Sequence, residues 1–334
     1  MPNCKYHDRM SALYRKISLQ AKVPDTLSGS RLDQIAAKLF PDHSRARLQG
    51  WIRSGCLLVD GQQSRPRQKL MAGMELSLEV ELKTGDGSQA AQIIPLAIVH
   101  EDENVLVINK AADMVVHPAA GHHQGTLLNG LLNHCPTLEN LPRAGIVHRL
   151  DKDTTGLIVV AKTLTVHTHL VRQLQQRAIS REYEAIVRGV LTGGGTVDAP
   201  LGRHSVYRKK RAVVASGQEA VTHYRVRKRY RHHTHIDVSL ETGRTHQIRV
   251  HMAHLKHPLV GDPVYGGRLQ IPAASAPELI EQLSSFRRQA LHARRLSFSL
   301  PGLEQPCTWE APLPEDFQSL LEVLTADAAR NDLT

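Results

Sequence analysis

Residues 145–161 read GIVHRLDKDTTGLIVVA, a charged stretch held between two apolar runs. Apolar runs of this kind are typical of strands that are buried on both faces. The pattern predicts a short charged connection between buried elements, with Asp151 near its centre. A carboxylate there would be rigidly supported, partly desolvated and close to cations. The alternative is that Asp151 only caps a turn, as Asp often does, and this stretch by itself favours neither.

The composition is that of a globular chain. The chain has 334 residues, 41% of them hydrophobic, which gives room for two domains at roughly 100–200 residues each. No apolar run approaches the roughly 20 residues that a membrane span needs. Residues 1–22 lack the apolar core of a secretory signal, and we expect residues 1–27 to be a disordered leader. Four widely spaced cysteines without a C-x-x-C pair argue against disulfides and a thiolate zinc site, and they indicate a reducing cytoplasm.

Positive charge is concentrated in two segments, within a formal net charge of +10. Residues 45–69 hold six Lys or Arg against Asp60, and residues 203–231 hold ten against Glu219. One charged run is usually a solvated face, but two with almost no acid favour a nucleic-acid partner. A membrane surface is disfavoured, because neither segment forms a clear amphipathic helix with aromatic anchors.

Residues 28–83 are predicted to form a small α+β domain. Apolar residues at helical spacing predict one helix from residue 32 to 39, ended by Pro41, and a second one capped by Ser44 and ended by Gly55. Asp60-Gly61 predicts a hairpin turn, and alternation over residues 74–82 predicts a strand with one wet face. Three basic residues fall on or near the second helix: Arg45, Arg47 and Arg53.

This pattern resembles the small RNA-binding domain named after ribosomal protein S-four. The matching segments are residues 31–33 (RLD), 44–48 (SRARL), 51–52 (WI), Gly55 and 59–61 (VDG). Asp60 replaces the Asn that the family usually has, and Asp also tolerates a left-handed turn conformation. Basic residues on an exposed helix fit contacts to an RNA backbone, which position the RNA without reading its sequence.

The rest of the chain is predicted to hold a linker at 84–95, a second domain at 96–325 and a tail at 326–334. Strands are expected around residues 105–108, 183–187 and 236–240, and helices after Thr126 and over 164–176. These elements show no regular βαβ rhythm. The predicted fold class is therefore α+β, with a mixed, largely antiparallel sheet and flanking helices.

The sequence shows no cofactor signature, since G-x-G-x-x-G, P-loop and H-E-x-x-H motifs are all missing. Four histidines, at positions 246, 251, 254 and 257, suggest a metal site, but their spacing matches no zinc template. A helix with polar or RNA-facing histidines is the favoured interpretation. We therefore expect neither a metal nor a cofactor.

Five segments carry a more specific signal: residues 109–118 (NKAADMVVHP), 148–151 (HRLD), 181–185 (REYEA), 240–251 (LETGRTHQIRVH) and 261–266 (GDPVYG). In this order they resemble the motifs of the RluA/RluD family of ribosomal RNA pseudouridine synthases. With the N-terminal domain included, the similarity spans roughly residues 28–325. Ala111 departs from the Pro that is common in the family, at a position without a catalytic role.

The resemblance implies that the protein converts uridine to pseudouridine. The N1–C1′ bond breaks, the base turns, and it rejoins the sugar through C5. One carboxylate suffices, because the departing base is also the returning nucleophile. Asp151 is the implied catalytic residue, attacking C1′ or assisting a glycal route, with Arg249 as its cationic partner. Tyr183 is implied to stack on the base, and Asp153 is left with the turn-capping role.

A uridine within folded RNA must be flipped out to reach such a carboxylate. Arg149 is expected to fill the space that the base leaves, or to hold the flanking phosphate. His148 and Arg244 are weaker candidates for phosphate contacts. Lys110 and His117 are expected to shape the wall of the substrate pocket.

The resemblance further suggests 23S ribosomal RNA of the large subunit as the target, at uridines of the helix 69 stem-loop, and a cytoplasmic monomer as the enzyme. Another ribosomal site or a transfer RNA are alternatives. A non-catalytic ribosome-assembly factor is a rival of another class, although an inactive relative would be expected to lose Asp151 or Tyr183. A nucleoside hydrolase lacks an evident second carboxylate and leaves both basic segments unexplained.

Overall fold

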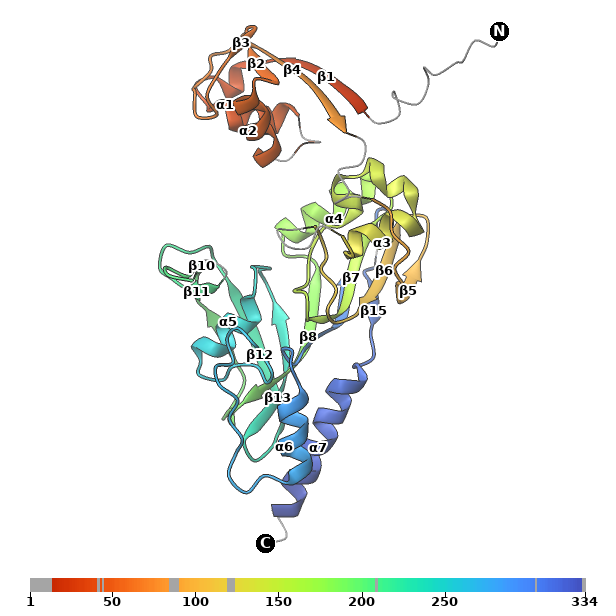
Figure 1. The fold of residues 1–334 in the computed structure, drawn as a ribbon, viewed down its shortest axis with the longest axis vertical. Coiled ribbons are helices and arrows are strands. Elements are labelled where there is room, and N and C mark those ends of the chain that lie inside the picture. Colours follow the sequence, from red (N-terminus) through yellow and green to blue (C-terminus); the bar gives the residue numbers. More distant parts are fainter. Residues whose placement is uncertain are drawn as a thin grey trace, which may run out of the picture. The chain divides into compact units, whose positions relative to one another are not determined.

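The computed structural model describes residues 14–40, 43, 45–83, 90–118, 124–207, 210–303 and 305–331. The chain forms two compact units, residues 1–90 and 91–334. The small unit is coloured red to orange in Figure 1, and the large unit runs from yellow to blue. None of the helices in these ranges is long and apolar enough to cross a bilayer.

The small unit packs two helices against one antiparallel sheet of order β1-β4-β2-β3. Its elements are β1 (Tyr14–Lys22), η2 (Asp25–Leu27), α1 (Leu32–Leu39), α2 (Arg45–Ser54), β2 (Leu57–Val59), β3 (Gln62–Gln63) and β4 (Glu75–Lys83). Asp60 and Gly61 have φ angles of 48° and 72°, as the predicted hairpin turn requires. The predicted roles of Pro41 and Ser44 at helix ends lie outside the described residues.

The predicted leader is wrong over its second half. β1 pairs along the whole of β4, and Val23 and Leu27 are buried in the core of the unit. Ile17 and Leu19 alternate with polar residues and pack on the same core, which is the pattern of a strand with one wet face. Residues 14–27 therefore belong to the folded unit, and residues 1–13 lie outside the described part of the chain.

The large unit is built on a nine-stranded sheet, in which β15 pairs with β14 beside the main order β5-β6-β7-β14-β8-β13-β12-β9. Its strands are β5 (Ile98–Glu101), β6 (Val105–Lys110), β7 (Thr155–Ala161), β8 (Ser180–Arg188), β9 (Gly195–Asp198), β12 (Val221–Arg229), β13 (His233–Leu240), β14 (Leu291–Phe298) and β15 (Cys307–Glu310). Of the strand pairings described, β7–β14 is parallel and the others are antiparallel. The predicted α+β class and largely antiparallel sheet are confirmed.

Helices cover both faces of this sheet, and β10 (Leu201–Arg203) and β11 (Arg211–Val213) form a separate hairpin. The helices are α3 (Leu127–His134), η3 (Pro136–Asn140), η4 (Pro142–Gly145), α4 (Leu164–Gln175), α5 (Gln247–His254), α6 (Pro277–Ser285) and α7 (Glu315–Asn331). Alternate residues of β6 and β7 pack against α4 on one face and α3 on the other. Alternate residues of β8 and β13 pack against α5, while α6 and α7 lie side by side over the opposite face (Figure 1).

The two apolar flanks of the Asp151 stretch differ. Every residue of β7 is buried, as the sequence predicts. Residues 145–147 do not form the expected second strand, and they are joined to β7 by the single bridge Ile146–Val160. Arg143 and Ala144 have left-handed φ angles of 54° and 51°, which turn the chain too sharply for an extended strand.

The outer boundaries of the second domain are also wrong. The backbone N–H of Gln92 donates to the carbonyl of Asn129 at 3.0 Å, so the end of the predicted linker is already packed on α3. α7 extends to Asn331, and buried Asp327 accepts from the Ala276 N–H at 2.9 Å. Residues 91–95 and 326–331 therefore belong to the large unit. The remaining linker at 84–89 and the tail at 332–334 lie outside the described residues.

Candidate active site

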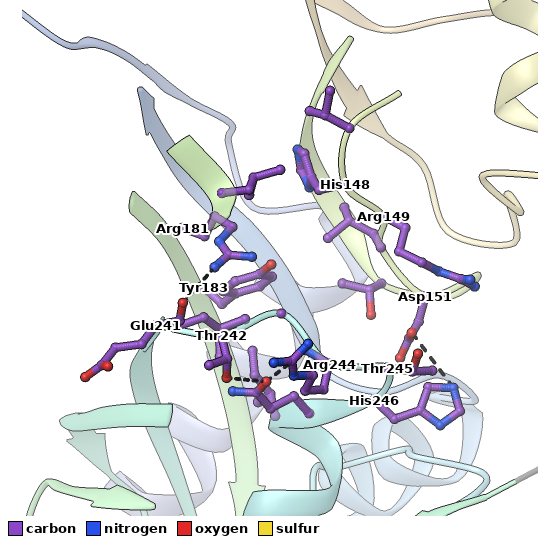
Figure 2. A pocket seen from close by; sticks show the side chains of 18 of the residues that line it. His148, Arg149, Asp151, Arg181, Tyr183, Glu241, Thr242, Arg244, Thr245 and His246 are labelled. Atoms are coloured by element: carbon purple, nitrogen blue, oxygen red, sulfur yellow. Dashed lines mark hydrogen bonds and ion pairs between the residues drawn. The ribbon is translucent and has the colours of Figure 1, made fainter. Parts of the chain in front are cut away.

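A cavity of about 800 Å³ opens between the 146–151 loop, α4, β8 and the segment that leads into α5 (Figure 2). Of the described residues that line it, six are arginines, at positions 143, 149, 177, 181, 244 and 249, and two are acidic, Asp151 and Glu241. This excess of positive charge suits an anionic ligand.

Asp151 sits on a loop that is fixed at several points. Leu150 is buried in the core beneath α5, and Thr154 N–H donates to the Asp151 carbonyl at 3.1 Å. Lys110 Nζ donates to the carbonyl of Lys152 at 2.8 Å from behind the loop. The Asp151 side chain keeps 17% of its surface exposed, toward the cavity.

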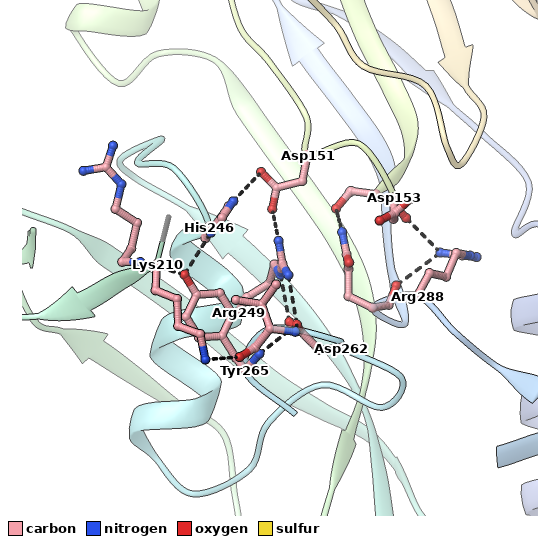
Figure 3. Close-up of polar contacts among 12 residues, drawn as sticks. Asp151, Asp153, Lys210, His246, Arg249, Asp262, Tyr265 and Arg288 are labelled. Atoms are coloured by element: carbon pink, nitrogen blue, oxygen red, sulfur yellow. Dashed lines mark hydrogen bonds and ion pairs between the residues drawn. The ribbon is translucent and has the colours of Figure 1, made fainter. Parts of the chain in front are cut away.

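Arg249 joins Asp151 to a second carboxylate (Figure 3). Its Nη1 donates to Asp151 Oδ2 at 2.8 Å, while Nε and Nη2 donate to Asp262 at 2.7 and 2.9 Å. Burial lowers the pKa of Arg249, but the bonds to Asp262 and Asp151 outweigh burial and raise it above its usual value. Burial raises the pKa of Asp262, but Arg249 outweighs it and the pKa is lowered. Both groups are therefore charged, and Arg249 is held in place for Asp151.

His246 faces the other oxygen of Asp151. It has a left-handed φ of 59°, directly before α5, and its Nε2 lies 3.9 Å from Asp151 Oδ1. Its Nδ1 lies 2.8 Å from Tyr265 Oη, which also accepts from the Arg211 N–H at 2.8 Å (Figure 3). Because Oη already accepts from the Arg211 N–H, we assign its proton to the bond with Nδ1, which places the proton of the neutral ring on Nε2, toward Asp151. Burial lowers the pKa of His246, although Asp151 opposes this, so the neutral ring is favoured.

Tyr183 lies on β8, between Val238 of β13 and Ala293 of β14. Its side chain is 7% exposed and lines the cavity. Burial raises the pKa of Tyr183, so its hydroxyl keeps its proton at neutral pH. The three residues implied to be catalytic, Asp151, Tyr183 and Arg249, thus line one cavity, and the predicted pairing of Asp151 with Arg249 is present.

The expected phosphate contacts have different surroundings. Arg149 is exposed at the cavity and makes no hydrogen bond or ion pair with the described residues. Arg244 also lines the cavity, and its Nε donates to the Glu219 carbonyl at 2.9 Å. His148 Nε2 accepts from the Val159 N–H at 3.1 Å, and burial lowers the pKa of His148 to about 3. His148 is therefore a neutral residue that lines the cavity and ties the loop to β7, and its role as a phosphate contact stays a prediction.

Lys110 is buried and does not line the cavity, contrary to its expected place in the pocket wall. Besides Lys152, its Nζ donates to the carbonyls of Ala111 and Met114 at 2.7 and 3.0 Å. Burial lowers the pKa of Lys110 to about 7. His117 does line the cavity, and burial lowers its pKa to about 4.

Asp153 does not cap a turn as predicted. Its carbonyl accepts from Arg288 Nη1 at 3.4 Å, whereas its carboxylate makes no hydrogen bond with the described residues. The carbonyl of Asp151, two residues earlier, closes the turn instead.

The three arginines of the small unit are not equivalent. Arg45 Nη2 donates to fully buried Asp33 at 2.7 Å, together with Gln49 and Arg31. Burial raises the pKa of Asp33, but these bonds outweigh it and the pKa is lowered. Arg45 therefore supports the fold of the unit. The Arg47 guanidinium lies 5.8 Å from the ring centre of Trp51, and Arg53 is exposed on α2.

Sequence reasoning missed Arg181, His246, Asp262 and Tyr265 as site residues. All four lie in the quoted family segments, but nothing in the sequence says that the last three meet Asp151 or Arg249. Arg181 precedes Tyr183 by two residues on a strand, and this spacing places both on one face. That signal was available.

The histidines that suggested a metal site separate in the structure. His251 is buried and bonded to Thr222 Oγ1 and to the Ala199 carbonyl, each at 2.9 Å. Across the described ranges, no group of three or more His, Cys, Asp or Glu is placed to hold a metal ion.

Comparison with known proteins places this geometry in a family. Residues 104–254 match the family described as RNA pseudouridylate synthase. The chain is 61% identical over 311 residues to ribosomal large subunit pseudouridine synthase D of Pseudomonas aeruginosa, covering 93% of this chain and 97% of that protein. A protein of the same name from Xanthomonas campestris is 52% identical over 311 residues, covering 93% of this chain and 94% of that protein.

Solved structures agree. Human RNA pseudouridylate synthase domain containing 4 has a TM-score of 0.54 at 27% identity, covering 69% of this chain and 93% of that one. With half or more of the residues identical over nearly the whole length of bacterial relatives, this chain belongs to the RluA/RluD family of RNA pseudouridine synthases.

Proposed function

We propose that this protein isomerises uridines of large-subunit ribosomal RNA, at the helix 69 stem-loop of 23S RNA. The observation that carries the chemistry is Asp151, held by Arg249 in a cationic cavity that Tyr183 also lines. The names of the relatives support the large subunit as target. The choice of helix 69 rests on the resemblance of the motifs.

In the proposed reaction Asp151 acts at the sugar. Its Oδ2 is bonded to Arg249, so Oδ1 is the oxygen that attacks C1′ or removes the proton from C2′. The N1–C1′ bond breaks and its electron pair stays on the base. The base turns, and C5 bonds to C1′ as the Oδ1–C1′ bond breaks or, in the glycal route, as Asp151 returns the proton to C2′. The C5 proton then leaves and N1 gains a proton, so the atoms balance. Stacking of the base on Tyr183 would contribute roughly 1–3 kcal/mol.

The uridine would reach this cavity by base flipping. A base inside a helix is out of reach of a carboxylate on a buried loop, and extrusion costs a few kcal/mol. The arginines that line the cavity are suited to the phosphates on either side of the flipped nucleotide. Among them, exposed Arg149 is the candidate to fill the gap in the RNA.

The small unit would bind the RNA backbone, in keeping with its resemblance to the S-four domain. Exposed basic side chains of α2, such as Arg53, suit contacts that position an RNA without reading it. We propose that the enzyme acts as a monomer, and that it acts in the cytoplasm, where ribosomal RNA is modified.

The catalytic proposal predicts that Asp151→Asn abolishes turnover. Tritium release from C5 of uridine-labelled ribosomal RNA should fall by at least about a thousandfold, or about 4 kcal/mol in the barrier. Asp153→Asn is the matched control, because its carboxylate lies two residues away on the same loop and makes no hydrogen bond with described residues; it should keep most of the activity. A fully active Asp151→Asn protein would refute the catalytic role.

The target is tested separately by mapping pseudouridines in ribosomal RNA from a deletion strain. Loss of modification in helix 69, restored by the wild-type gene and not by Asp151→Asn, is the expected result. An unchanged map would reject the ribosomal target and point to transfer RNA. If the Asp151→Asn strain lost the modification yet assembled ribosomes and grew normally, unlike the deletion strain, a role of the protein in assembly would be favoured.

A further inference from the structure

Arg181 carries a buried charge without a buried counter-charge. Its side chain is 8% exposed, and no carboxylate of the described residues pairs with it. Its Nη2 donates to the Glu241 carbonyl at 3.3 Å, and its buried Nε has no partner among the described residues. Buried guanidinium groups normally have an acceptor for their donors, because an unpaired buried charge is costly. The missing acceptors are therefore expected from a ligand.

The position of Arg181 says which part of a ligand it meets. Arg181 and Tyr183 alternate with Glu182 on β8, so both side chains stand on one face of the strand and line the cavity (Figure 2). Arg149 and Arg244 are exposed, whereas Arg181 is buried. The exposed arginines suit phosphates on the RNA backbone, and the buried one lies where the inserted base would be.

Gly243 leaves room for the guanidinium of Arg181, because it has no side chain. A Cβ on Gly243 would lie 2.6 Å from Arg181 Nη1. The φ angle of Gly243 is not in the left-handed region, so its backbone does not require glycine. A side chain at this position would have to displace the end of the Arg181 side chain.

We propose that Arg181 donates a hydrogen bond to a carbonyl oxygen of the flipped-out uracil and so recognises the base. The inference rests on the proposed entry of the base into the cavity beside Tyr183. A phosphate oxygen is the other source of the same acceptor chemistry. Uracil offers two carbonyl oxygens at its edge, within reach of side chains that surround a base stacked on Tyr183.

The test measures binding without turnover, in full-length protein carrying Asp151→Asn. Two synthetic helix 69 stem-loops are compared, identical except that one target uridine is intact in the first and abasic in the second. Adding Arg181→Met should weaken binding of the uridine RNA about tenfold, as expected for one hydrogen bond from a charged group, and leave the abasic RNA unchanged. Arg181→Lys should recover part of the loss, because it keeps a charged donor.

Two further variants separate recognition from general damage. Gly243→Ala should push the end of the Arg181 side chain aside and give the same selective loss, with no further loss when both changes are combined. Gly243→Ala also tests the proposal if the Arg181→Met protein fails to fold. Arg177→Met removes another arginine of the cavity, one that is bonded to Glu241 and Glu219, and should weaken both RNAs equally.

Equal losses for uridine and abasic RNA in Arg181→Met would overturn the proposal in favour of a phosphate contact. No loss with either RNA would also overturn it. If the Asp151→Asn parent bound both RNAs equally, the base would not enter the cavity. That result would reject base flipping itself, which is distinct from a failure of Arg181 alone.

Discussion

The two oxygens of Asp151 have different neighbours, and this difference assigns their roles. Oδ2 accepts a hydrogen bond of 2.8 Å from Arg249, whose other donors are taken by Asp262. Oδ1 faces His246 Nε2 at 3.9 Å, too far for a hydrogen bond. Oδ1 therefore has room for a sugar atom, while the hydrogen bond to Oδ2 keeps the carboxylate oriented.

The hydrogen-bond chain from Tyr265 to His246 predicts a loss of turnover in Tyr265→Phe. Without the hydroxyl proton, the His246 ring is free to carry its proton on Nδ1 and to present a lone pair to Asp151. We expect kcat to fall about tenfold, or about 1.4 kcal/mol in the barrier, with RNA affinity unchanged. The Phe ring keeps its packing against Arg249, so stability should change little.

Single-turnover rates measure the effect of Tyr265→Phe on kcat, and RNA binding measures its effect on affinity. Tyr230→Phe is the control, because Tyr230 is buried with α6 and α7 on the opposite face of the sheet. An unchanged kcat in Tyr265→Phe would show that the His246 tautomer does not matter to catalysis. Nitrogen NMR of His246 reports the tautomer directly.

His148 predicts a loss of stability at low pH. Its ring accepts a hydrogen bond from Val159 when neutral, and burial lowers its folded pKa to about 3, against 6.5 in the unfolded chain. Between these values the unfolded state binds more protons, so the free energy of unfolding falls as pH drops from about 6.5 toward 3. His148→Gln keeps an acceptor and does not titrate.

Urea unfolding at pH 7, 5.5 and 4.5 should therefore show a shallower decline in His148→Gln than in the wild type. His254→Gln makes the same change at an exposed position and should follow the wild-type curve. Parallel curves for all three proteins would contradict the role assigned to His148.

Some site residues were predictable because their signal is local. Asp151, Tyr183 and Arg249 each stand in a short motif whose type and order the sequence displays. The buried role of Lys110 was not predictable, because lysine is rarely buried and its three carbonyl partners come together only in the fold. Nor does the spacing of Asp262 from Arg249 indicate a paired contact.

At the scale of elements, the parallel contact of β7 with β14 holds the two halves of the large sheet together. Gly156 has a φ of 109°, and a Cβ there would overlap the Ala293 carbonyl oxygen and lie 2.5 Å from Ala293 N. Backbone atoms of a paired strand have no room to shift. Gly156→Ala should therefore destabilise the large unit by at least about 3 kcal/mol, from clash and strain combined.

Chemical denaturation measures this loss. Gly267→Ala is the matched control, because Gly267 also has a positive φ, 69°, but no atom within 4 Å of its would-be Cβ. It should cost about 1 kcal/mol, from backbone strain alone. Equal effects of the two substitutions would show that the close approach of β14 is not what requires glycine.

Elements were predictable where neighbours along the chain determine them. The capped helix after Thr126 and the hairpin at Asp60-Gly61 rest on local hydrogen bonds and turn preferences, and both are confirmed. The insertion of β14 between β7 and β8 was not predictable, because strand pairing between distant segments leaves no local pattern. β1 was not predictable, because its alternation is short and its partner strand, β4, lies far along the chain.

At the scale of the whole molecule, net charge does not distinguish cations that bind RNA from cations that hold the fold. Arg45 and Arg53 both belong to the first basic segment, but Arg45 pairs with buried Asp33 and Arg53 is exposed. Arg45→Gln should lower the stability of the small unit by about 2 kcal/mol, because Asp33 keeps Arg31 and Gln49 as partners. Arg53→Gln should leave stability unchanged and weaken RNA binding.

Salt titrations of RNA affinity check the predicted effect of Arg53→Gln on RNA binding. Removing one phosphate contact should reduce the slope of log affinity against log salt by about 1 in Arg53→Gln. Thermal unfolding checks the predicted loss of stability in Arg45→Gln. A stable Arg45→Gln protein, or an unaltered salt slope in Arg53→Gln, would contradict the division of roles.

The late position of β14 in the chain has a consequence for synthesis. A ribosome releases the chain from its N-terminus, so β7 and β8 emerge well before the strand that must lie between them. Until residues 291–298 appear, the loop with Asp151 and the strand with Tyr183 have no continuous sheet to join them. A chain that has released β7 and β8 but not yet residues 291–298 is therefore expected to lack the arrangement that brings Asp151 and Tyr183 to one cavity.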